Sequence, residues 1–300
     1  MTTISVFSYL AATHTLHVAE YPRINYGVEV EGTDRFLAGD GPLVAAILAA
    51  FGHETTLFSN PVGSDPDGAS IRKRLEGWGV RHRPTRAGVK QTRVNTVVAD
   101  RAGNRTWFSG LAGIVNELSG IDLRQFTGTP AAYLDCYQVL GDTPQPVLEA
   151  ALSTGQDVVV NLGGGPVPSW LPGTVAGRQL GVLQTNADEH DPADSARLIR
   201  ELSGPDVAGL VVVTAGRAGA TALTATGEVL TAAAVPVQVA QVQGAGAVFS
   251  ATLMHARLAD TNPARALTLA CVGGSLWCSR RPHGKLPTFD EVSALARASG

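Results

Sequence analysis

Short β-branched runs alternate with longer runs rich in alanine and leucine, and this alternation limits the fold more than any other feature of the chain. The short runs are continuously apolar, as in strands whose two faces are both buried. The expected strands are Ile4–Ser8, Thr55–Ser59, Ala131–Leu134, Asp157–Asn161, Gly181–Gln184 and Leu210–Thr214. The expected helices are Pro42–Phe51, Pro66–Trp78, Gln145–Ser153, Asp191–Leu202, Ala245–Leu258, Pro263–Cys278 and Phe289–Ala298. This pattern predicts an α/β protein with parallel strands and right-handed crossovers.

Two segments, Thr15–Glu31 and Gln91–Phe108, show strand-like patterning without an intervening helix. The second contains a hairpin signal with its turn at Ala102–Asn104. The two segments are far apart in sequence, so we expect them to pair as a small sheet outside the main one. Such a sheet beside an α/β body suits a lid over a ligand site. A further hairpin is expected at Ala220–Leu230, before the last three helices.

The composition excludes several classes of protein. With 23 Lys and Arg, 26 Asp and Glu, and 16% charged residues, the net charge of −3 argues against a broad nucleic-acid surface. The 3 cysteines are too few for a disulfide scaffold. No apolar run approaches the ~18 residues of a membrane span, and the first residues lack the pattern of a signal peptide. We expect a cytoplasmic protein whose partners include neither nucleic acid nor membrane.

Several glycine-rich turns follow expected strands or precede expected helices. Gly244, Ala245 and Gly246 open a helix, where free backbone N–H groups and the helix dipole can hold an anion. A plain packing turn explains the same residues. The segment Ala38–Pro42 can likewise face a ligand or simply form a tight turn. The turn Gly216–Gly219 follows an expected strand, at the edge where open α/β sheets bind ligands.

A polar cluster, Thr185–His190, follows the expected strand Gly181–Gln184. Asn186 and Glu189 are three residues apart, so both can face the strand ends. This arrangement suits indirect binding of Mg²⁺ through water beside phosphates. A helix N-cap with Glu189 completing a capping box is the alternative.

These turns, in this order, resemble the ribokinase-like (PfkB) carbohydrate kinase family over nearly the whole chain. The segment Ala38–Gly52 resembles the first signature of the family, and Val62–Gly68 is similar to its VGxDxxG segment. Asn186–Glu189 matches its NxxE motif, and Gly216–Gly219 its GxxG motif. Gln241–Phe249 resembles the second signature, DTxGAGDxF.

The resemblance implies a three-layer α/β/α ribokinase-like body (residues 1–12, 38–90 and 113–300) with a small β-sheet lid (residues 13–37 and 91–112). It implies transfer of the γ-phosphoryl group of ATP, with Mg²⁺, to a hydroxyl of a sugar or nucleoside. The anion hole would be Gly244, Ala245 and Gly246; Asn186, Glu189, Gly216 and Gly219 would serve the nucleotide, with Glu189 supporting Mg²⁺. Thr13, Gly39, Asp40 and Leu43 would face the acceptor. Relatives often form homodimers through the lid, so we expect one here.

The chain departs from the family pattern at its polar positions. Ala247 occupies the position of the general base, and alanine cannot accept a proton. Gln241 replaces the first Asp of the second signature, and Leu43 replaces an Asn expected near sugar hydroxyls. Thr13 occupies the position of an Asp that often grips the sugar. A segment that often reads DxNxR is Asn161–Gly165 here, without the acid or the base.

Three hypotheses of function follow. The first is an impaired or inactive kinase homologue, a pseudokinase that binds a nucleotide, sugar or nucleoside. The second is an active kinase with an unusual acceptor and a relocated base, for which Asp40 in the first glycine turn is a candidate. The third is different chemistry on the same scaffold.

Overall fold

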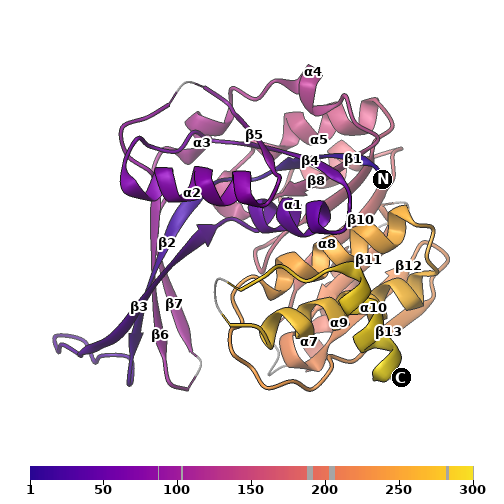
Figure 1. Cartoon of the computed structure of the whole chain (residues 1–300). Coiled ribbons are helices and arrows are strands. Elements are labelled where there is room, and N and C mark those ends of the chain that lie inside the picture. The colour runs from indigo at the N-terminus through magenta and orange to yellow at the C-terminus, as the bar shows by residue number, and fades with distance from the viewer. Residues whose placement is uncertain (87, 103, 188–191, 203–206, 282–283, 300) are drawn as a thin grey trace.

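A nine-stranded sheet forms the centre of the protein (Figure 1). The computed structural model describes residues 1–86, 88–102, 104–187, 192–202, 207–281 and 284–299. The strands lie in the order β13-β12-β11-β10-β9-β8-β1-β4-β5; those from β11 to β5 are parallel, and β12 and β13 add an antiparallel hairpin. Their bounds are β1 Thr3–Phe7, β4 Glu54–Ser59, β5 Arg81–Pro84, β8 Ala131–Asp135, β9 Asp157–Asn161, β10 Leu180–Asn186, β11 Ala208–Thr214, β12 Ala220–Thr224 and β13 Val229–Ala232.

Helices cover both faces of this sheet. Alternate strand residues point to opposite faces, and both faces are apolar: Val6 and Tyr133 join one core, while Phe7 and Leu134 join the other. The first core is completed by α1 Asp40–Ala50, α2 Pro66–Gly77, α8 Ala245–Leu258, α9 Pro263–Cys278 and α10 Phe289–Ala298. The second core is completed by α3 Ile114–Leu118, α4 Leu123–Phe126, α5 Pro144–Ser153, α6 Leu171–Val175 and α7 Pro192–Leu202. The predicted three-layer α/β/α architecture is confirmed.

The expected elements of the body are present with small shifts at their ends. The helix over Pro42–Phe51 begins earlier, at Asp40, because Gly39 (φ 93°) turns the chain directly into it. The first residue of the helix expected over Asp191–Leu202 lies outside the described residues, and α7 begins at Pro192 within them. The short strand β5 and the short helices α3, α4 and α6 carry too little periodicity to be predicted from sequence.

A four-stranded sheet stands beside the body, in the order β3-β2-β6-β7 (Figure 1). It consists of β2 Ala11–Val18, β3 Val30–Ala38, β6 Val94–Asp100 and β7 Arg105–Gly110. The prediction of a small sheet from two distant segments is confirmed. The strands of the first segment begin and end elsewhere than expected, since β2 starts at the apolar Ala11 and residues 19–29 connect the two strands.

No helix in the described part of the chain combines the length and the apolar character that crossing a membrane requires.

Candidate functional site

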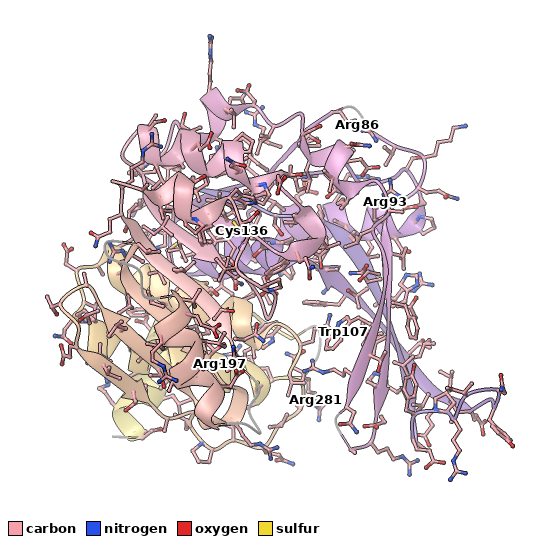
Figure 2. All side chains as sticks on the ribbon, turned by 180° about the vertical axis from the view of Figure 1, so that it is seen from behind. Arg86, Arg93, Trp107, Cys136, Arg197 and Arg281 are labelled. Atoms are coloured by element: carbon pink, nitrogen blue, oxygen red, sulfur yellow. The ribbon has the colours of Figure 1, made fainter. Side chains whose placement is uncertain are left out.

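A cavity of about 350 Å³ lies where the small sheet meets the body. The body contributes the turn before α1, the turn before α8 and the carboxyl end of β10. The small sheet contributes residues from all of its strands. In Figure 2 the small sheet projects from the body, and Trp107 lies between the two. Strand ends, helix N-termini and a covering sheet together make this cavity the candidate functional site.

The turn before α8 needs glycine at position 244. Gly244 has φ 86°, which side chains disfavour, and a Cβ there would lie 2.5 Å from Cδ2 of Leu43. The Trp277 indole N–H donates to the carbonyl of Gln243 at 2.7 Å and holds the turn in place. No described side chain caps α8. The Ala245 N–H donates to the Val242 carbonyl at 3.3 Å, so the first turn offers an anion the N–H groups of Gly246 and Ala247.

The carboxylate of Asp40 faces this turn. Gly39 and Asp40 both line the cavity, and Asp40 is the first residue of α1. A Cβ placed on Gly246 would lie 3.9 Å from Oδ2 of Asp40. Asn161 donates from Nδ2 to the same oxygen at 3.3 Å. Ala247, at the expected position of the base, has a fully buried methyl side chain and no carboxylate. Asp40 instead places a carboxylate beside the glycine turn.

A second carboxyl group, Asp135, lies buried behind Asp40 at the end of β8. Its Oδ2 accepts from the Ser8 hydroxyl at 2.5 Å and from the Gly41 backbone N–H at 3.0 Å. Its Oδ1 accepts from the Tyr133 hydroxyl at 2.8 Å. Burial, and then the charge of Asp40, raise the pKa of Asp135 to about 7. Burial also raises the pKa of Asp40, so the pair binds a proton more tightly than ordinary carboxyl groups do.

This pair predicts a specific pH dependence of stability. The unfolded chain releases the Asp135 proton near pH ~4, whereas the folded chain holds it to about pH 7. Raising the pH through this window therefore favours the unfolded state. We expect Asp135→Asn to become more stable relative to wild type as the pH rises from ~5 to ~8, measured by urea unfolding. Asp142→Asn, at an exposed position, is the control. A constant difference between Asp135→Asn and wild type would contradict the prediction.

The structure brings some of the predicted site residues together and separates others. Thr13, Leu43 and Asn186 line the same cavity as Gly39, Asp40 and Gly244. Ala245 and Gly246 follow in the first turn of α8. Gly216 and Gly219 flank the turn after β11, beside the end of β10 but outside the cavity lining. Glu189 lies outside the described residues, so its predicted role with Mg²⁺ stays a prediction.

Sequence reasoning missed several residues of the site. Tyr9, Asn95, Arg105 and Trp107 line the cavity, and Asp135 lies behind it. Asp135 had one available signal, because it directly follows a buried strand whose end faces the ligand edge. The others depend on strand register in the small sheet, which the sequence pattern alone does not fix.

Comparison with known proteins connects this geometry to one group of structures. No protein-family model matches the chain, and no curated protein matches it. Solved structures do match. A putative ribokinase from Agrobacterium tumefaciens shares 18% identity over 99% of this chain and 98% of its own, with a TM-score of 0.76. The microbiome-derived acarbose kinase Mak1 shares 17% identity over 99% of both chains, with a TM-score of 0.79.

The chain has the ribokinase-like fold. A nucleoside kinase from Burkholderia thailandensis, solved in complex with inosine, shows the same likeness, at 16% identity over 98% of this chain and 97% of its own, with a TM-score of 0.76. At these identities the likeness establishes the architecture, while the chemistry has to be argued from the side chains of this chain.

The resemblance of the sequence motifs to ribokinase-like kinases implies a nucleotide and a metal ion, and the backbone at the start of α8 fits the nucleotide's phosphates. The uncapped N-terminus of α8 and the glycine at position 244 leave backbone N–H groups for a phosphate to approach. Asn186, on β10, reaches the same cavity. The described residues contain no cluster of three His, Cys, Asp or Glu side chains. They therefore form no site against which binding of Mg²⁺ can be judged.

Proposed function

We propose that this chain is a cytoplasmic phosphotransferase that uses a nucleotide to phosphorylate a hydroxyl group of a small molecule, with Asp40 as the proton acceptor. One observation carries this proposal: the carboxylate of Asp40 lies beside Gly246, in the cavity that Gly244 also lines. An anion-binding turn and a proton acceptor facing one space are the two parts that phosphoryl transfer needs.

In this proposal each group of the chain has a separate task. A bound nucleotide supplies the phosphoryl group. The free N–H groups at the start of α8 stabilise the negative charge of the transferring group. Asp40 accepts the proton of the acceptor hydroxyl, and its raised pKa brings it closer to the working pH, where a general base is most effective. Asn161 holds the Asp40 carboxylate in place.

The ligands of structurally similar proteins agree with this assignment. A ribokinase from Arabidopsis thaliana was solved with ribose and ATP, and one from Cryptococcus neoformans with ADP. Their likeness in fold supports ATP as the nucleotide and a sugar or nucleoside as the class of acceptor for this chain. Mg²⁺ as the accompanying ion rests on the family resemblance alone.

The experiment is a measurement of ADP release from ATP and Mg²⁺ in the presence of a panel of sugars and nucleosides. We expect release that depends on the acceptor, together with a phosphorylated acceptor detected by mass spectrometry. ATP binding without acceptor-dependent release of ADP would overturn the proposal.

The second candidate is a pseudokinase, a protein that binds the same ligands without transferring phosphate. The buried alanine at position 247 favours it, since no carboxylate extends from the first turn of α8. The same titrations separate the two candidates, because the pseudokinase predicts ATP affinity and no phosphorylated product.

We also propose that the protein forms a homodimer through the small sheet. Within the described residues, β3 and β7 are the outer strands of this sheet, and unpaired strand edges favour pairing with another chain. Ile24 and Tyr26, in the connection between β2 and β3, are exposed apolar side chains. We expect a dimer in sedimentation velocity and a shift towards monomer for Ile24→Asp. A wild-type monomer would contradict the prediction.

A further inference from the structure

One row of side chains on the small sheet forms a wall of the cavity. Thr13 on β2 lies directly opposite Phe36 on β3 and Asn95 on β6. Directly opposed residues of paired strands point to the same face, and all three line the cavity. Whatever occupies the cavity therefore contacts this face of the sheet.

Asn95 in this row has an unused hydrogen-bonding atom. Its side chain is 4% exposed, and its Oδ1 is buried without a hydrogen-bond partner among the described residues. The Tyr9 side chain lies beside this amide. A buried acceptor without a partner is costly, and the residue that carries this one lines the cavity. A ligand that donates an N–H or O–H to Oδ1 removes this cost.

Trp107, on β7, adds an aromatic ring to the same face of the small sheet. Trp107 lies opposite Val97 on β6. Val97 is two residues from Asn95 on the same strand, so Trp107 and Asn95 point to the same face of the sheet. Trp107 lines the cavity, yet 54% of it is exposed, and the guanidinium of Arg105 lies 5.4 Å from the ring centroid. Large exposed aromatic rings in a cavity provide stacking surfaces for flat ligands.

From these two observations we propose that the acceptor contains a flat aromatic heterocycle, as a nucleoside does, which stacks on Trp107 and donates a hydrogen bond to Oδ1 of Asn95. This inference rests on the proposed function, since it places the reacting hydroxyl toward Asp40. A simple sugar lacks the flat aromatic ring that would stack on Trp107, so it gains nothing from base stacking on this side of the cavity.

The test is a binding titration by calorimetry with adenosine, inosine and uridine against ribose and fructose. At least one nucleoside should bind ~10-fold or more tightly than both sugars, because stacking of one base contributes about that much. Trp107→Leu should weaken nucleoside binding ~10-fold, and Trp107→Phe should restore most of it. The matched control is Phe108→Leu, since Phe108 is 52% exposed on the opposite face of β7 and does not line the cavity.

The role of Asn95 is tested by pairing a ligand change with a residue change. If adenosine is the preferred nucleoside, purine riboside, which lacks its amino group, should bind the wild-type protein more weakly. In Asn95→Leu this difference should disappear. For inosine or uridine, the ring N-methylated analogue serves the same purpose. A difference that persists in Asn95→Leu would overturn the assignment of the donor to Oδ1.

The outcomes separate this inference from the proposed function. Phosphorylation of sugars with no preference for nucleosides would refute the inference and leave the phosphotransferase intact. Nucleoside binding that depends on Trp107, without release of ADP, would support the inference and refute the phosphotransferase. Equal affinity of the sugars and all three nucleosides would refute the inference whatever the activity.

Discussion

Replacing Asp40 by asparagine should lower the rate of phosphoryl transfer by about 10²-fold or more while leaving the affinity for ATP nearly unchanged. Asparagine keeps the shape of the side chain but cannot accept a proton at neutral pH. The carboxylate it removes is the one beside Gly246. Steady-state kinetics with the best acceptor, and calorimetric titration with ATP, measure the two effects.

The matched control for this variant is Asp290→Asn. Asp290 is exposed in the first turn of α10 and does not line the cavity. Its replacement should leave both the rate and the ATP affinity unchanged. A rate for Asp40→Asn within about twofold of wild type would remove Asp40 as the base, since a positioned base contributes about 10²–10⁴-fold.

The body of the fold could be predicted from the sequence because its strands are buried on both faces. Runs such as Asp157–Asn161 carry a continuous apolar signal that neither a surface helix nor an exposed strand shares. The Asn-Pro pair at the start of α9 marks that helix start locally. These signals lie within a few residues of the structure they specify.

The site could be predicted only in part, because its chemistry joins distant segments. Asp135 lies 94 residues from Gly41 and 127 from Ser8, the groups that donate to it. No local pattern shows that Asp135, the last residue of β8, lies behind Asp40, the first residue of α1. Burial raises the pKa of Asp135, and this burial exists only in the folded chain.

The small sheet shows the same limit for binding residues. Its presence followed from strand-like patterning, but the side chains that face the cavity depend on register. A shift of one residue in β7 would exchange Trp107 for Phe108, and both are exposed aromatic residues. The sequence alone does not distinguish the two, whereas the pairing of Trp107 with Val97 in the structure does.

Replacing Gly244 by alanine should both destabilise the protein and reduce phosphoryl transfer by about 10²-fold or more. A residue with a side chain at position 244 has to adopt a positive φ, which lowers the free energy of unfolding by about 1–3 kcal/mol. The added Cβ would also lie 2.5 Å from Leu43 and 3.2 Å from the indole nitrogen of Trp277, so the turn has to move. Movement of the turn displaces the N–H groups at the start of α8, which the transferring phosphate needs. Urea unfolding and the rate of ADP release measure the two losses.

Gly227→Ala separates the cost of backbone strain from the loss of the site. Gly227 has φ 84°, close to the 86° of Gly244, but a Cβ there would meet nothing within 4 Å. It lies in the turn between β12 and β13, outside the cavity lining. Its replacement should lower the free energy of unfolding by about 1–3 kcal/mol and leave transfer unchanged. If Gly244→Ala is destabilised as expected but transfers phosphate at the wild-type rate, the turn before α8 does not bind the transferring group, and the proposed anion site is wrong.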